Sequence, residues 1–181
     1  MRWLLIFLFV FFAGCMSSED IGRLQYWNGV EDKNLALRDF ADIKYHLNWS
    51  IDSRNIVKPK EWNTDFGKLE DICDEAERRF EYKKTDYVLK NFLTVSEFES
   101  LGYGVCDEWS WWIYIRLLKE GFNARWCLGQ FQGDRKYTHA WAIVLINNRI
   151  YIIDQGGPIS ILNVRKYEPV AAFQFDKVWR Y

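Results

Sequence analysis

The sequence predicts an α+β fold in which N-terminal helices, including one that is fully buried, pack on an antiparallel sheet formed by the C-terminal half. Apolar residues recur at three- and four-residue spacing over residues 67–83 and 106–120, as in helices that bury one side or more. Two β-branched runs, residues 139–146 and 149–154, flank Asn147-Asn148, a pair that suits a tight hairpin turn because asparagine tolerates a positive φ. The buried helix needs a sheet to cover it, and this hairpin is the strongest sheet signal in the chain.

Composition places the chain among globular proteins long enough to bury a core. Its 181 residues are 49% hydrophobic and 18% aromatic, and the formal charge at pH 7 is −1. A nearly neutral chain offers no basic surface, so we expect no nucleic-acid partner. The chain has two histidines, His46 and His139, so a histidine-dependent mechanism has few candidates.

The first fifteen residues have the pattern of an export signal. Arg2 precedes an apolar run over residues 3–12, and Ala13-Gly14-Cys15 follows. The run is too short for a membrane-spanning helix, which takes about 20 apolar residues. The small pair before Cys15 resembles a bacterial lipoprotein signal, which implies removal of residues 1–14 and lipidation of Cys15. A plain cleaved signal and an uncleaved N-terminal anchor are the alternatives.

The lipoprotein resemblance implies an exported protein held to a membrane by its N-terminal lipid. Met16 stands where an aspartate would favour retention in the inner membrane. We therefore expect an outer-membrane lipoprotein facing the periplasm if the host has two membranes, and otherwise one on the outer face of the cell membrane. Residues 15–24 then form a polar tether, and residues 25–181 form a single domain.

The N-terminal half of this domain is predicted to be helical. We expect an amphipathic helix over residues 34–47 and a second helix over residues 67–83, for which Asp65 is the cap. A short helix or turn is expected within residues 87–92.

Helical and strand signals then alternate toward the C-terminus. Ser96, with Glu99 three residues later, predicts a capped helical turn. The buried helix ends at Gly121, a natural C-cap, and a strand follows over residues 124–131. Residues 159–181 alternate enough to supply one or two further strands.

Three cysteines besides Cys15 raise the question of a disulfide. They are Cys73, Cys106 and Cys127. Exported proteins can form disulfides, so a bridge between Cys73 and Cys127 is one interpretation. Two buried free thiols are the other, because free cysteine behaves as a small apolar residue.

Cys106 stands at the start of the buried helix, two residues after Gly104. Unpaired N–H groups and the helix dipole create positive potential there, which favours the thiolate. A cysteine in an apolar segment is more often a core residue, so a nucleophilic role requires a base near the sulfur.

The hairpin brings a base and an acid together. Pairing outward from Asn147-Asn148 puts Trp141 opposite Asp154. His139 lies two residues from Trp141 and points to the same face, so His139 and Asp154 are diagonal neighbours. Structural roles for His139 and Asp154 are the alternatives, and His46 is expected to lie on a surface helix.

A catalytic group forms if the N-terminus of the buried helix packs against the His139 face. Cys106 is then the nucleophile, His139 its general base, and Asp154 the group that orients the imidazole. The Cys106 N–H is one candidate oxyanion donor, and the sequence assigns no second. A metal site is the chemical rival, but the chain has no Cys-x-x-Cys or His-x-x-x-His spacing, so we expect no metal.

The motifs around these residues resemble the transglutaminase-like core. They are Gly104-Val105-Cys106, Leu117 to Arg125, Gly129, Thr138-His139-Ala140-Trp141 and Tyr151-Ile152-Ile153-Asp154. The resemblance covers residues 97–155. It implies a papain-like fold with Cys106, His139 and Asp154 as the triad. Nothing in the sequence resembles the family's calcium sites, so we expect no metal, and we expect no cofactor. Asp107 and Glu108 match an acidic position that follows the cysteine in bacterial transglutaminase-like cysteine peptidases.

The resemblance and the spacing together favour an envelope-anchored cysteine enzyme. Such an enzyme performs amide hydrolysis, as a peptidase, or acyl transfer, on a protein or a cell-wall peptide. The alternative is a catalytically silent lipoprotein that uses the same fold as a protein-binding module. The sequence leaves the oligomeric state open.

Overall fold

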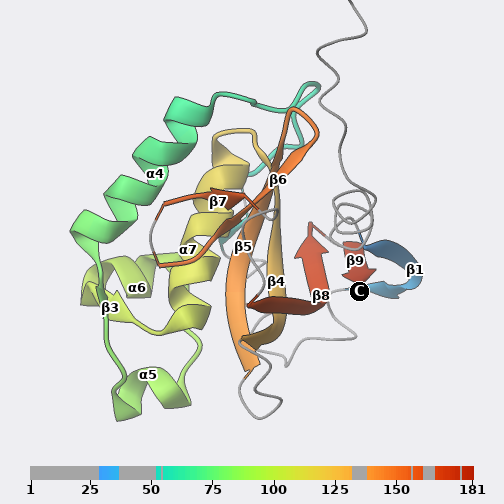
Figure 1. The fold of residues 1–181 in the computed structure, drawn as a ribbon. Helices are drawn as coiled ribbons and strands as arrows, with labels where there is room; N and C mark the ends of the chain where they lie inside the picture. Colours follow the sequence, from blue (N-terminus) through green and yellow to red (C-terminus); the bar gives the residue numbers. More distant parts are fainter. Residues whose placement is uncertain are drawn as a thin grey trace, which may run out of the picture.

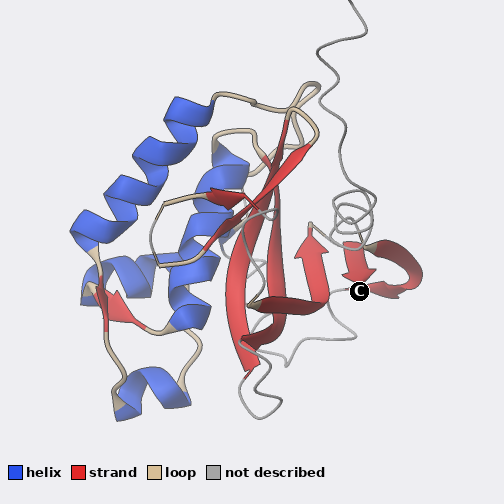
Figure 2. Ribbon diagram, in the orientation of Figure 1, coloured by secondary structure: helices blue, strands red, loops and turns tan. Residues whose placement is uncertain are grey.

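The computed structural model describes residues 29–36, 52–53, 55–131, 138–155, 157–160, 166–175 and 177–181. A seven-stranded sheet forms one layer, and the helices that the structure describes lie on one side of it (Figures 1 and 2). The predicted signal, Cys15, the tether and His46 lie outside the described residues. Within the described residues, no helix is both long and apolar enough to cross a membrane.

The sheet is antiparallel throughout. Its spatial order is β1 (Val30–Ala36), β9 (Lys177–Arg180), β8 (Tyr167–Gln174), β4 (Asn123–Phe131), β5 (Thr138–Ile146), β6 (Arg149–Ile153) and β7 (Ile159–Ser160). A separate parallel pair joins β2 (Glu81–Tyr82) to β3 (Tyr103–Gly104). The C-terminal tail thus supplies three strands, where one or two were expected.

The four described helices are α4 (Phe66–Arg79), α5 (Asp86–Lys90), α6 (Val95–Leu101) and α7 (Cys106–Lys119). α7 packs on β4 and β5 and also contacts α4 and α6, so it forms the centre of the domain. It is buried around most of its circumference, as its all-round apolar pattern predicts. Its last turn is followed by Gly121 at a φ of +80°, the conformation that favours glycine at this position.

The hairpin forms as predicted. Asn147 and Asn148 have φ values of 50° and 61°, and Ile146 pairs with Arg149. The register continues to the pair Ala142 and Ile153, and Asp154 is the residue directly after β6. The two-residue turn therefore fixes which side chains of β5 and β6 share a face.

Several helix ends differ from the sequence prediction. Asp65 caps α4 by accepting the Lys68 N–H at 3.1 Å, as expected. The helix nevertheless ends at Arg79 rather than residue 83, because Phe80 turns extended and the next two residues pair with β3. β1 extends to Ala36, so the helix predicted to begin at residue 34 does not begin there.

The cap of α6 is Thr94, not Ser96. Thr94 and Glu97 form a reciprocal capping box, in which the Thr94 N–H donates to Glu97 at 2.8 Å. The expected partner of Ser96, Glu99, instead accepts the indole N–H of Trp112 at 2.8 Å. Two overlapping capping motifs were present in the sequence, and the tertiary contact of Glu99 decides between them.

Two apolar clusters lie on opposite faces of the sheet. Ala140, Ala142 and Val144 of β5 belong to the cluster that includes α4, α6 and α7. Trp141 and Ile143 alternate with them and belong to a second cluster. The sheet is thus buried on both faces, as the doubly apolar strands indicate.

Cys73 and Cys127 are both buried and unbridged. Cys73 lies on α4 in the first cluster, whereas Cys127 lies on β4 in the second, on the far side of the sheet. Because the sheet separates them, the disulfide left open by the sequence does not form.

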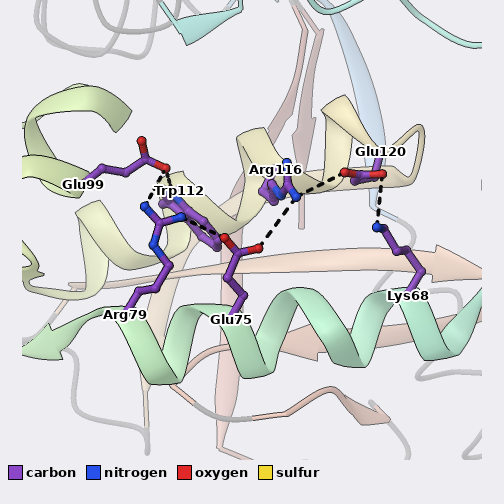
Figure 3. A network of polar contacts seen from close by, with 7 residues as sticks. All are labelled: Lys68, Glu75, Arg79, Glu99, Trp112, Arg116 and Glu120. Atoms are coloured by element: carbon purple, nitrogen blue, oxygen red, sulfur yellow. Dashed lines mark hydrogen bonds and ion pairs between the residues drawn. The ribbon is translucent and has the colours of Figure 1, made fainter.

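Polar contacts bind α4, α6 and α7 to one another along their outer surfaces (Figure 3). Glu75 of α4 accepts from Arg79 at 2.8 Å and lies 3.7 Å from Arg116 of α7, which also pairs with Glu120 at 3.4 Å. Such partly exposed pairs each contribute at most about 1 kcal/mol, so the network orients the helices more than it stabilises them.

Candidate active site

Cys106 is the first residue of α7 and is half-buried. The strand β3 and the extended residue Val105 lead directly into it. The Val105 N–H donates to the carboxylate of Glu108 at 3.0 Å, which is one half of a capping box. The Cys106 N–H lies in the first helical turn, where no carbonyl four residues earlier is available as a partner.

His139 and Asp154 meet as the hairpin register predicts. Nε2 of His139 lies 2.7 Å from Oδ2 of Asp154, and the two side chains are 16% and 15% exposed. The Nε2–H donates to the carboxylate, which leaves Nδ1 as the ring nitrogen available to a second partner.

Besides Asp154, the Cys106 thiol acts on the imidazole. Burial alone would lower the pKa of His139, but hydrogen bonds to Asp154 and to Cys106, with the charges of both, raise that pKa to about 10. The structure therefore brings together the three residues that the sequence selected. At neutral pH the imidazole is held in its protonated form, which is the partner that a thiolate requires.

The face of the sheet on which α7 packs differs from the prediction. α7 packs on the face of Ala140 and Ala142, not on the face that carries His139 and Trp141. The short turn after α7 makes it antiparallel to β4 and hence parallel to β5, so both begin at the same end of the sheet (Figure 1). Cys106 and His139 meet around that end rather than through face-to-face packing.

Two carboxyl groups follow the cysteine. Oδ1 of Asp107 lies 3.8 Å from the Cys106 sulfur, and burial raises the pKa of Asp107. Glu108 is 2% exposed, and burial raises its pKa to about 7 even though backbone N–H groups stabilise its charged form. Asp107 thus borders the sulfur, whereas Glu108 supports the loop that precedes it.

Two tyrosines at the site carried no signal in the sequence. The Tyr167 O–H of β8 donates to Oδ2 of Asp154 at 2.7 Å, the same oxygen that His139 approaches. Tyr82 of β2 is 40% exposed, and its pKa is raised by burial and then by Cys106 and Asp154, while its side chain hydrogen-bonds Gln155. Tyr82 therefore stands at the open rim of the site.

No group of three or more His, Cys, Asp or Glu side chains suited to a metal ion occurs within the part of the chain that the structure describes. The groups around Cys106 are instead paired with one another by hydrogen bonds. Such an arrangement suits nucleophilic and acid–base chemistry.

The fold is that of a transglutaminase-like, papain-like domain. The sequence model of the transglutaminase-like domain matches residues 41–179, so the chain belongs to that family. The predicted α+β, papain-like fold is confirmed. A search of curated proteins found no match.

Solved structures give the same fold. LapG of Legionella pneumophila has a TM-score of 0.55 and 15% identity, over 80% of this chain and 83% of LapG. Its calcium-bound form has a TM-score of 0.54 with the same identity and coverage. At this identity the likeness establishes the fold alone.

Proposed function

We propose that this protein is a cysteine enzyme that hydrolyses or transfers acyl groups through Cys106, His139 and Asp154. The observation that carries the proposal is that the His139 imidazole is bonded to Asp154 at 2.7 Å, while the Cys106 thiol acts on the same ring and helps to raise its pKa. Nucleophile, base and orienting acid are the parts that acyl transfer through a thioester requires.

The reaction divides into two halves. The Cys106 thiolate attacks an amide carbonyl carbon, the C–N bond breaks, and the imidazolium of His139 gives its proton to the departing amine. The acyl group is then held as a thioester. His139 removes a proton from water, or from an acceptor amine, as that molecule attacks, and the thiolate leaves. Hydrolysis and transfer share the first half and differ in the second acceptor.

We further propose that the enzyme works at the cell envelope on a protein or a wall peptide, anchored through Cys15. The support is the basic start, the short apolar run and Ala13-Gly14-Cys15. Incorporation of labelled palmitate into the full chain expressed in a bacterium, and its loss in Cys15→Ala, tests the anchor.

Alkylation tests the catalytic proposal without a known substrate. We expect iodoacetamide to label Cys106 rapidly near pH 7, as located by peptide mapping, and the rate to fall at least tenfold in His139→Ala. Buried Cys73 and Cys127 are internal controls that should stay unlabelled in the folded protein.

A slow, thiol-like rate that His139→Ala leaves unchanged would contradict the enzyme and favour the binding module. For a reactive Cys106, trapping an acyl group on it from envelope extract and weighing the adduct would identify the substrate. Adding an acceptor amine to the trapped form would then separate transfer from hydrolysis.

A further inference from the structure

Tyr167 completes a network behind the imidazole. Its O–H and Nε2 of His139 both lie 2.7 Å from Oδ2 of Asp154. The phenol ring packs at 5.2 Å from the Trp141 ring and 6.1 Å from the His139 ring, centroid to centroid. Three aromatic contacts, counting Phe131 at 5.0 Å, restrict where the hydroxyl can point.

An irregularity in β8 is what turns Tyr167 toward the site. Ala171 and Phe173 face the helix layer, and simple alternation would place Tyr167 on that face as well. The pairing of β4 with β8 shifts by one residue between Leu128 and Gly129, which skips Val170. The shift is a β-bulge, and bulges next to active sites re-aim side chains in this way.

The chemistry of the shared oxygen sets what Tyr167 does. Burial and the Asp154 carboxylate raise the pKa of Tyr167, so the phenol stays a proton donor across the working range of pH. Two donors on one carboxylate oxygen compete for its charge, and each weakens the other. The tyrosine therefore fixes the carboxylate and also moderates how strongly it stabilises the imidazolium.

The geometry points to Tyr167 as a positioning residue that holds Asp154 in the orientation that receives Nε2 of His139. The inference rests on the proposed function, because it concerns the same nucleophile and base. It assigns Tyr167 no contact with substrate.

The test is the pH dependence of Cys106 alkylation by iodoacetate in Tyr167→Phe. This anionic reagent reacts fastest when an imidazolium stands beside the thiolate, so the alkaline limb of the profile reports the loss of the His139 proton. Without the tyrosine O–H, the bond between Asp154 and His139 strengthens. We expect that limb to move to higher pH by roughly half a unit or more, because the Tyr167 O–H no longer competes with Nε2 of His139 for Oδ2 of Asp154.

Two further variants make the result specific. Asp154→Asn removes the acceptor charge and should move the alkaline limb to lower pH, opposite to Tyr167→Phe. Tyr114→Phe removes another buried hydroxyl, one that lies away from the site and accepts the Phe175 N–H at 3.1 Å. This variant should lower stability without moving the alkaline limb of the profile.

An alkaline limb in Tyr167→Phe that stays in place, moves to lower pH or matches Tyr114→Phe would overturn the inference. If wild-type Cys106 reacts fast and loses that rate in His139→Ala, this outcome removes the role of Tyr167 and leaves the proposed function standing. A wild-type rate indifferent to His139→Ala would instead overturn both.

Discussion

Glu108 shows how a single buried carboxyl serves the nucleophile loop at a cost in stability. It lies two residues after Cys106 in the first turn of α7, accepts the Val105 N–H at 3.0 Å and is 2% exposed. Burial raises its pKa from 4.5 to about 7. Because the folded state then binds the Glu108 proton more tightly than the unfolded state, this carboxyl stabilises the folded state below pH 4.5. That contribution is lost as the pH rises through 7.

Glu108→Gln should remove this pH dependence, because an amide accepts the same N–H without ionising. The pKa difference corresponds to about 3 kcal/mol at most. Between pH 4.5 and pH 8 we therefore expect the free energy of unfolding of Glu108→Gln to rise, relative to that of wild type, by up to that amount. Urea unfolding at the two pH values measures the change. The raised pKa of His139 also makes stability decline above pH 6.5. This decline is the same in both proteins, so the difference between their free energies of unfolding reports Glu108 alone.

Glu70→Gln is the matched control, because Glu70 is exposed on α4. Its stability difference from wild type should be small, because the substitution is on the exposed surface. Parallel stability curves for wild type and Glu108→Gln would show that Glu108 does not titrate abnormally.

Single elements explain what the sequence could and could not predict. The hairpin was predictable because a two-residue asparagine turn fixes strand parity, and parity alone places His139 beside Asp154. Tyr167 was not, because its face depends on a one-residue shift between β4 and β8, which no local pattern encodes. The capping residue of α6 was likewise decided by a distant partner, Trp112.

The layering of α7 was missed for a related reason. Both faces of β5 are apolar, so sequence periodicity does not say which face the helix covers. Cys106 and His139 lie at the same end of the sheet nevertheless, because the connection after α7 brings the start of the helix there. Connectivity between elements, rather than packing on the assumed face, is therefore what places Cys106 near His139.

Gly129 links β4 to the bulge, which gives a prediction about these elements. A Cβ on Gly129 would lie 2.2 Å from the Glu168 carbonyl oxygen and 2.6 Å from the Trp141 ring. Gly129→Ala must therefore push β8 away from β4 or displace Trp141. We expect it to destabilise the protein by about 2 kcal/mol and to shift the iodoacetate profile as Tyr167→Phe does.

Gly67→Ala provides the control for adding a methyl group. Its Cβ would meet the Asp65 side chain at 3.4 Å, within a helix where alanine is favoured. That substitution should be neutral or stabilise by up to about 1 kcal/mol. Denaturant unfolding compares the stabilities of the two variants. A Gly129→Ala protein as stable as wild type would show that β4 and β8 accommodate the added methyl group, and would contradict the prediction.

The whole molecule is divided by its sheet, and this division governs the cysteines. Cys73 packs among the helices and Cys127 on the opposite face, so each thiol contributes to a separate apolar cluster. Burial raises the pKa of Cys73 to about 12 and raises that of Cys127 as well, so neither is a ready thiolate. Cys106, at the end of the sheet, is the half-buried one of the three.

Stability should therefore be independent of reducing agent, even if the protein folds in an oxidising compartment. Alkylation in 6 M guanidinium without reductant should label Cys73, Cys106 and Cys127 on separate peptides, and the unfolding midpoint should not change with reductant. Because a native disulfide is typically worth 2–4 kcal/mol, its presence would lower that midpoint visibly on reduction. A peptide linking Cys73 to Cys127 would require one of the two thiols to cross the sheet, and so would contradict the two-sided core itself.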